Sequence, residues 1–177
     1  MRGTKDAHMK NKLKRIKLLA MDVDGVLTNG QIIYDSEGKE TKVYDVQDGY
    51  AIVLAKKSGL KTAIITARES PTVAIRAQDL GIDKLYQNAY PKLGAYERML
   101  QEFSVKEQEV CFIGDDLPDI PLLRRVGFAV AVKNAAAEVL QEVDYITKNF
   151  GGKGAVREVI ELLLKTQGKW QAILKAL

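Results

Sequence analysis

Short apolar runs alternate with amphipathic stretches along this chain, and the alternation limits the folds that it can adopt. Buried strands are expected over 16–21, 61–65, 110–113 and 128–132, and shorter ones over 85–87 and 143–146. Helices are expected over 51–57, 71–80, 93–103, 120–126, 135–142 and 155–165. Strands that alternate with helices predict an α/β fold, in which a doubly wound parallel sheet carries helices on both faces.

The remaining segments complete the expected domain organisation. Residues 31–34 and 42–45 flank the turn-prone stretch Asp35–Gly38, which predicts a small β-hairpin flap over about 31–45. A chain of 177 residues fits one compact domain, here expected over 16–167. Residues 1–15 are predicted to be a basic, flexible N-terminal tail, and 168–177 a C-terminal tail that begins at a glycine.

Charge and apolar content argue against two classes of partner. The net charge is +4, but the first 17 residues hold seven basic and one acidic residue, so the rest of the chain is mildly acidic. A nucleic-acid-binding domain instead gathers its basic residues on a folded face. No apolar run approaches the length of a membrane span. Because the single Cys111 cannot form an internal disulfide, a cytoplasmic protein is expected.

Reactive side chains follow three of the predicted strands directly. Asp22 and Asp24 follow the first strand, Thr66 follows the second, and Asp115 opens an acidic cluster after the fourth. The carboxyl ends of parallel strands form the ligand site of such a sheet, so these groups are expected to meet in one crevice. Clustered carboxylates need a cation, and oxygen ligands favour a hard ion such as Mg²⁺. Each Asp taken alone is also a common turn or capping residue.

These residues resemble the four ordered motifs of the haloacid dehalogenase superfamily. The matching positions are Asp22-x-Asp24-Gly25-Val26-Leu27-Thr28, Thr66, Lys92 and Gly114-Asp115-x-x-x-Asp119, and the resemblance covers about residues 16–165. It implies a Rossmann-like domain. The segments 25–30, 48–49, 66–70 and 151–158 are similar to the small branch without a cap domain, which acts on phosphorylated keto-sugar acids. The resemblance therefore implies a phosphatase.

Catalytic roles follow from the resemblance by position. Asp22 is the implied nucleophile that becomes an aspartyl phosphate, and Asp24 is the implied acid and base. Thr66 is expected to hydrogen-bond the phosphoryl group, and Lys92 to offset its charge. Lys92 departs from the family's usual sequence context, so the alternative interpretation is an exposed lysine in the first turn of a helix. Lys84 is the other candidate for this role, but it precedes its strand instead of following it.

The implied cofactor is Mg²⁺, held by the Asp22 carboxylate, the Asp24 backbone carbonyl and the Asp115 carboxylate. Asp116 and Asp119 are expected to support the metal shell or to position the lysine.

The implied substrate is 3-deoxy-D-manno-octulosonate 8-phosphate, a precursor in lipopolysaccharide biosynthesis. Its expected binding residues are Gly25, Thr28, Asp48, Arg68 and Arg76. Arg68 suits the carboxylate or phosphate of this sugar acid, because a guanidinium binds either group through two hydrogen bonds. Three alternatives stay open: a phosphatase of a related nonulosonate 9-phosphate, a phosphatase of another sugar phosphate, and a non-catalytic regulatory module on the same fold.

Without a cap domain, another subunit is the expected cover of the site. The resemblance implies a homotetramer whose hairpins pack together through Ile32, Tyr34, Val43 and Tyr44. At the chain end, Trp170, Ile173, Leu174 and Leu177 follow one another at helical spacing. This apolar stripe either packs on its own subunit or, as the resemblance favours, reaches a neighbour's site.

Overall fold

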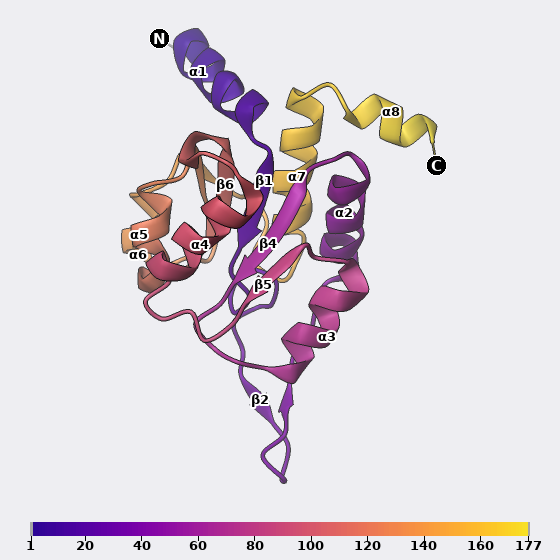
Figure 1. Cartoon of the computed structure of the whole chain (residues 1–177), viewed down its shortest axis with the longest axis vertical. Coiled ribbons are helices and arrows are strands. Elements are labelled where there is room, and N and C mark those ends of the chain that lie inside the picture. The colour runs from indigo at the N-terminus through magenta and orange to yellow at the C-terminus, as the bar shows by residue number, and fades with distance from the viewer. Residues whose placement is uncertain (1, 177) are drawn as a thin grey trace.

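The computed structural model describes the backbone of residues 2–176 and the side chains of residues 7–176. The helices are α1 Arg2–Arg15, α2 Val46–Lys57, α3 Pro71–Leu80, α4 Leu93–Phe103, α5 Ile120–Leu123, α6 Ala137–Leu140, α7 Ala155–Thr166 and α8 Trp170–Lys175 (Figure 1). The strands are β1 Leu18–Met21, β2 Ile33–Tyr34, β3 Glu40–Thr41, β4 Lys61–Ile65, β5 Lys84–Tyr86, β6 Val110–Gly114, β7 Phe128–Ala131 and β8 Tyr145–Ile146.

Six of these strands form one parallel sheet in the order β5-β4-β1-β6-β7-β8. Successive residues of β1 face opposite sides. Leu19 and Met21 pack into a core with α2, α3 and α7, whereas Leu18 and Ala20 pack into a second core with α4, α5 and α6. Helices therefore cover both faces, and the predicted α/β, doubly wound architecture is confirmed.

The strand order places a topological switch point at the centre of the sheet. The chain builds β4 and β5 on one side of β1, and then crosses to build β6, β7 and β8 on the other. Connections leave β1 and β6 in opposite directions, which opens a crevice beyond their carboxyl ends. The residues that follow these two strands, Asp22 and Asp115, are among those that the sequence singles out.

The predicted ends of a helix agree with the structure where the residues that mark them were recognised in the sequence. Helix α3 spans the expected residues 71–80, with Pro71 in its first turn and Gly81 in the left-handed conformation (φ 64°) at its end. Helix α2 begins at Val46 rather than at 51, because the Asp45 side chain caps the backbone N–H groups of Gln47 and Asp48. Helices α5 and α6 are shorter than expected.

The N-terminal segment differs most from expectation. Residues 2–15 form helix α1, and Leu13 is fully buried while Met9 packs against the same core. Lys12 Nζ lies 2.6 Å from Asp144 Oδ1. The prediction of a flexible tail over 1–15 is therefore wrong for this helix, because two apolar residues four positions apart anchor it to the domain. No helix within residues 2–176 is long and apolar enough to span a bilayer.

The C-terminal segment forms the short helix α8 after Gly168, whose φ is 73°. Trp170 and Ile173 pack against the core of their own subunit, while Leu174 remains 46% exposed. Of the two interpretations of the apolar stripe, this packing supports the first for Trp170 and Ile173. Leu177 lies outside the described residues.

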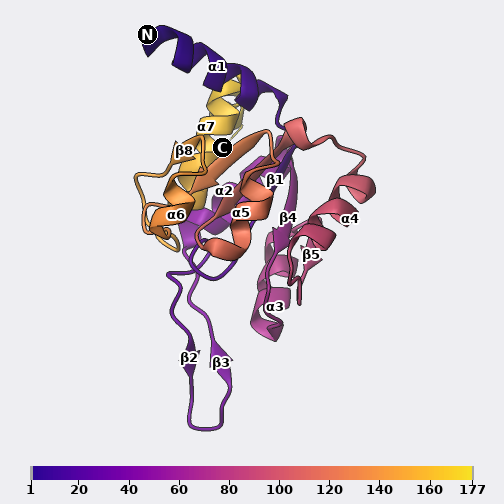
Figure 2. The ribbon, with the colours of Figure 1, turned by 90° about the vertical axis from the view of Figure 1, so that its left-hand side faces the viewer.

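The hairpin is present, although its paired strands lie closer to the turn than predicted. Strands β2 and β3 pair through Ile33 with Thr41 and Tyr34 with Glu40. Figures 1 and 2 show the hairpin projecting from the body at the end opposite α1. Because the carboxyl ends of the parallel strands point toward the same end, the base of the hairpin borders the crevice.

Candidate active site

A cavity of about 250 Å³ lies beyond the carboxyl ends of β1, β4 and β6. It is lined by Asp22, Asp24, Gly30, Thr66, Ala67, Arg68, Lys92, Asp115, Asp116, Pro118 and Asp119. The structure thus brings together all the residues for which the sequence predicts a catalytic or metal-binding role.

The loop after β1 holds two of these carboxylates in a tight turn. The backbone carbonyl of Val23 accepts hydrogen bonds from the N–H groups of Val26, Leu27 and Thr28 at 2.9–3.2 Å. The Thr28 hydroxyl oxygen accepts hydrogen bonds from the N–H groups of Gly25 and Gly30. Thr28, which was predicted to bind substrate, is buried and is not among the residues that line the cavity; its hydrogen bonds shape the loop.

Gly25 brings this loop against Asp115, the residue that directly follows β6. Its φ is 93°, and a Cβ at this position would lie 1.9 Å from Asp115 Oδ2. Only glycine can occupy such a position, because any side chain would displace the Asp115 carboxylate. Gly25 is therefore a close-approach residue. It is not among the residues that line the cavity, where a substrate-binding role was predicted.

Two further glycines, Gly151 and Gly152, hold the same loop through backbone contacts. Gly152 donates its N–H to the carbonyl of Val26 at 2.9 Å, and a Cβ on Gly151 would lie 1.6 Å from the Gly25 carbonyl oxygen. The segment before α7 packs backbone against backbone on the catalytic loop, which explains why it is rich in glycine.

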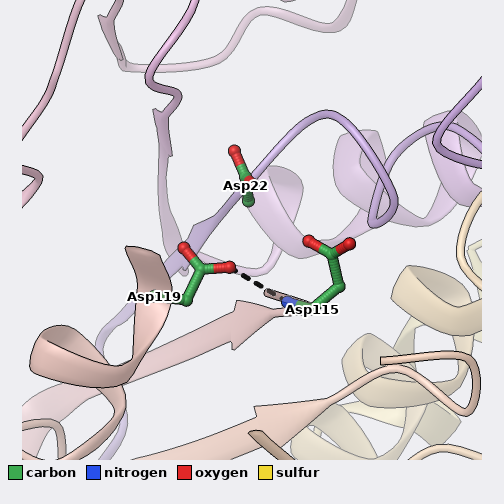
Figure 3. Close-up of side chains that lie close together, drawn as sticks. All are labelled: Asp22, Asp115 and Asp119. Atoms are coloured by element: carbon green, nitrogen blue, oxygen red, sulfur yellow. Dashed lines mark hydrogen bonds between the residues drawn. The ribbon is translucent and has the colours of Figure 1, made fainter. Parts of the chain in front are cut away.

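Three carboxylates that line the cavity lie close together, as Figure 3 shows. Oxygen atoms of Asp22, Asp115 and Asp119 lie within 4.8 Å of one another. Asp119 Oδ2 accepts the backbone N–H groups of Asp115 at 3.0 Å and Asp116 at 3.4 Å. Asp115 Oδ1 is buried and has no hydrogen-bond partner among the described residues. A buried carboxylate oxygen without a partner, beside another carboxylate, fits a hard divalent cation such as Mg²⁺.

Lys92 supplies the positive charge that the protein itself places in this cluster. Its Nζ lies 3.0 Å from Asp22 Oδ2 and 2.6 Å from Asp119 Oδ1, and the residue is only 3% exposed. Burial by itself lowers the pKa of Lys92, but Asp22 and Asp119 outweigh it and raise the pKa. Lys84 instead begins β5 and pairs with Glu102, so of these two lysines it is Lys92 that reaches the site.

Burial of the carboxylates shifts their protonation. Burial raises the pKa of Asp22 to about 6, against the opposing attraction of Lys92. Burial raises the pKa of Asp115 to about 8, with the negative charges of Asp22 and Asp119 adding to the effect. A cation bound here would favour the charged form of both carboxylates, because its positive charge would stabilise them in place of the lost water.

The loop after β4 supplies the groups that face the acidic cluster. Thr66 is buried, lines the cavity and donates its backbone N–H to the Tyr86 carbonyl at 2.9 Å. Arg68 lines the cavity with a side chain that is 40% exposed. Asp116 also lines it, and its side chain accepts the Leu117 N–H at 2.8 Å, which caps the turn at Leu117–Asp119.

Two predicted substrate-binding residues lie elsewhere. Asp48 is buried in α2, where its carboxylate accepts the backbone N–H groups of Gly154 at 3.1 Å and Arg157 at 2.7 Å. It caps the start of α7, so its role is structural. Arg76 lies in α3 and stacks on the Tyr44 ring, with its guanidinium carbon 5.5 Å from the ring centre. It does not line the cavity. The structure therefore does not bring Asp48 and Arg76 to the cavity with the other predicted site residues.

The hairpin contributes charged residues that the sequence did not reveal. Lys42 Nζ donates a hydrogen bond to Asp24 Oδ1 and lies 3.5 Å from Glu40 Oε1. Glu40 in turn accepts hydrogen bonds from Arg68 at 2.5 Å and from the Ser70 hydroxyl at 2.6 Å. Glu40 and Lys42 precede the apolar residues Val43 and Tyr44 in the sequence. Their partners Asp24, Arg68 and Ser70 lie 18 or more residues away, so the local sequence did not reveal these contacts.

Comparison with known proteins agrees with this geometry. Residues 84–160 match the haloacid dehalogenase-like hydrolase family. The chain is 42% identical to the 3-deoxy-D-manno-octulosonate 8-phosphate phosphatase KdsC of Salmonella typhi, over 94% of this chain and 89% of that protein.

Solved structures show the same likeness. A hydrolase of the HAD superfamily, subfamily III A, from Legionella pneumophila has a TM-score of 0.96 at 38% identity, covering 98% of this chain and 96% of that one. The Moraxella catarrhalis 3-deoxy-D-manno-octulosonate 8-phosphate phosphatase, solved with magnesium, phosphate and KDO, has a TM-score of 0.93 at 45% identity, covering 95% and 97%. This chain therefore belongs to the 3-deoxy-D-manno-octulosonate 8-phosphate phosphatases of the haloacid dehalogenase superfamily.

Proposed function

We propose that this chain is a Mg²⁺-dependent phosphatase that hydrolyses 3-deoxy-D-manno-octulosonate 8-phosphate to the sugar acid and inorganic phosphate. The observation that carries the proposal is the cluster of the buried Asp22 and Lys92 with the half-buried Asp115 at the switch point of the sheet. Phosphoryl transfer requires positioning and charge neutralisation above all, and this cluster supplies both. Family membership over almost the whole chain supplies the substrate.

In the first step, a carboxylate oxygen of Asp22 attacks phosphorus. The bond between phosphorus and the sugar oxygen breaks, and that oxygen takes a proton from the Asp24 carboxyl group. The product sugar acid leaves, and an aspartyl phosphate remains on Asp22. Lys92 offsets charge on the phosphoryl oxygens, and the Thr66 hydroxyl donates a hydrogen bond to them.

In the second step, the Asp24 carboxylate takes a proton from water, and the water oxygen attacks phosphorus. The bond to Asp22 breaks, phosphate leaves, and the two carboxyl groups return to their starting states. When bound, Mg²⁺ supplies further neutralisation of the phosphoryl oxygens. The Asp22 and Asp115 carboxylates and the Asp24 backbone carbonyl would hold it. Asp119 orients Lys92 and the loop that carries Asp115.

Arg68 is the residue proposed to recognise the acid end of the substrate. Its guanidinium lies at the mouth of the cavity, bonded to Glu40 and to the Tyr34 hydroxyl. A substrate carboxylate can compete for the same donors, because a guanidinium carries five N–H groups. A phosphatase of a nonulosonate 9-phosphate is the alternative. The complete set of catalytic groups argues against a non-catalytic module.

The proposal includes a cytoplasmic homotetramer as its working form. Ile33, Tyr34 and Val43 on the hairpin are 40%, 58% and 64% exposed, and burial of such apolar groups favours association. Light scattering on the eluted protein tests the assembly: a tetramer mass supports it, and a monomer mass at micromolar concentration contradicts it.

A panel of sugar phosphates tests the activity directly. The purified protein is assayed for phosphate release from the octulosonate 8-phosphate, a nonulosonate 9-phosphate, glucose 6-phosphate and an aryl phosphate. Each assay is run with Mg²⁺, after chelation, and after chelation with Mg²⁺ restored. The proposal predicts the highest kcat/KM for the octulosonate 8-phosphate, and only with Mg²⁺. A preference for the nonulosonate 9-phosphate would favour the alternative.

A further inference from the structure

Lys42 lies in an unusual position for a lysine on a projecting hairpin. It directly follows β3, yet its side chain is only 1% exposed. A buried ammonium group is costly unless it is paired, and Lys42 is paired on two sides: with Asp24 Oδ1 and, at 3.5 Å, with Glu40 Oε1. The hairpin base is therefore fastened to the catalytic loop by a buried ion pair.

Lys42 contacts Asp24 without entering the cavity. Asp24 lines the cavity, whereas neither Lys42 nor Glu40 is among its lining residues. The Glu40 side chain, 13% exposed, is itself held by Arg68 and Ser70. Because Glu40 is held in place by these bonds, its contact with Lys42 fixes the ammonium group, and Lys42 can hold Asp24 in one orientation.

We propose that Lys42 is a positioning residue for Asp24, and that the hairpin is thereby part of the catalytic machinery. The proposal rests on the proposed function, in which Asp24 exchanges a proton with the leaving oxygen and then with water. Lys42 occupies Oδ1 and leaves Oδ2 to exchange that proton. Fixing a reacting group in this way removes rotational freedom that would otherwise slow both steps.

The two steps can be separated with an aryl phosphate, p-nitrophenyl phosphate. Its nitrophenolate leaves without a proton, so the first step does not need Asp24. The second step, in which water attacks the aspartyl phosphate, still needs Asp24 as base. With the sugar phosphate both steps need Asp24, because an alkoxide must be protonated as it leaves.

The variant Lys42→Met removes the ammonium group and keeps the length of the side chain. The matched control is Lys39→Met, because Lys39 is an exposed lysine of the same hairpin. Thermal melting checks the fold of each protein. Stopped-flow mixing with p-nitrophenyl phosphate measures the first turnover, and steady-state assays on the sugar phosphate measure kcat and KM.

For Lys42→Met, we expect kcat on the sugar phosphate to fall by about 10- to 100-fold, with KM within about threefold of wild type. With p-nitrophenyl phosphate, we expect a rapid release of one nitrophenolate per site, followed by slow turnover. Lys39→Met should behave as wild type in both assays. A loss of packing alone would slow the first turnover too and would not produce this burst.

Several outcomes would overturn the proposal. They are unchanged turnover of Lys42→Met on both substrates, a large rise in KM with unchanged kcat, and a slowed first turnover with the aryl phosphate. If the wild type turned over only the aryl phosphate, the proposed substrate would fail, yet the burst would still test Lys42.

The double variant Asp24→Asn/Lys42→Met guards against misfolding of the single variant, because no unpaired ammonium or carboxylate remains between these two residues. If Lys42 acts through Asp24, the double variant should match Asp24→Asn in its rate with the aryl phosphate. A further loss beyond Asp24→Asn would show that Lys42 acts in another way.

Discussion

Lys92 Nζ lies 3.0 Å from Asp22 Oδ2, inside a cavity where both residues are almost fully buried. The lysine just before α4 thus meets the carboxylate just after β1. Because both groups are shielded from water, their charge-assisted contact is strong, and it leaves the other oxygen of the nucleophile for attack. The expected behaviour of the enzyme follows from this arrangement and its neighbours.

Replacing Lys92 by Met should lower kcat by about 100- to 1,000-fold, because it removes a charge that stabilises the phosphoryl group in the transition state. Lys84→Met is the matched control, since Lys84 pairs with Glu102 at the far end of β5. Its kcat should stay within about twofold of wild type. Steady-state phosphate release measures both. Equal losses in the two variants would remove Lys92 from the site.

Replacing Gly25 by Ala should impair Mg²⁺ use, because the new Cβ would lie 1.9 Å from Asp115 Oδ2. Gly38→Ala is the control: its φ is also positive, at 79°, but nothing lies within 4 Å. Both variants should lose about 1 kcal/mol of unfolding free energy from backbone strain. Only Gly25→Ala should need more Mg²⁺ for half-maximal activity, as a titration of activity with Mg²⁺ would show. Identical titrations would contradict the close approach.

Mg²⁺ binding should release protons near neutral pH. Burial raises the pKa of Asp115 to about 8, so this group is largely protonated at pH 7 in the metal-free protein. Binding requires the carboxylate, so about one proton per ion should be released at pH 7 and almost none at pH 9.5. Calorimetry in two buffers of different ionisation enthalpy measures this number. Its absence at pH 7 would contradict the raised pKa.

The same shift has a consequence for stability. A carboxyl group whose pKa is raised on folding contributes most below its ordinary pKa of 3.8, and this contribution is lost as pH rises through the folded value of about 8. The metal-free protein should therefore lose stability between about pH 4 and pH 8, and saturating Mg²⁺ should reduce that loss. Thermal melting with and without Mg²⁺ compares the two profiles.

Replacing Arg68 by Glu should discriminate between substrates. On the octulosonate 8-phosphate, the reversed charge repels the carboxylate, so kcat/KM should fall by about 10- to 100-fold. On p-nitrophenyl phosphate, which has no carboxylate, the fall should be much smaller. Parallel assays on the two substrates provide the measurement. Equal losses would instead place Arg68 on the phosphoryl group or in a structural role.

Much of the fold could be predicted because its signals are local. The sheet is doubly wound as expected, and α3 spans the predicted residues because Pro71 and Gly81 mark its two ends. Helix α1 was missed because its anchors, Met9 and Leu13, lie among many charged residues. Its packing depends on a core that the local sequence does not reveal.

The candidate site divides in the same way. Asp22 and Asp115 were predictable because each directly follows a central strand. The capping role of Asp48 could not be predicted, because its partners, the N–H groups at the start of α7, lie more than a hundred residues away. Lys42 was missed for a related reason: only the folded hairpin brings it to Asp24.

The central claim is that Asp22 carries the phosphoryl group during turnover. The most direct test mixes the Mg²⁺-loaded enzyme with octulosonate 8-phosphate, quenches it in acid within the first turnover, and locates the modified residue by peptide mass spectrometry. The account predicts a phosphorylated peptide that contains Asp22. The variant Asp22→Asn should melt at the normal temperature, yet show neither the phosphopeptide nor turnover. Near wild-type phosphate release by Asp22→Asn would contradict it.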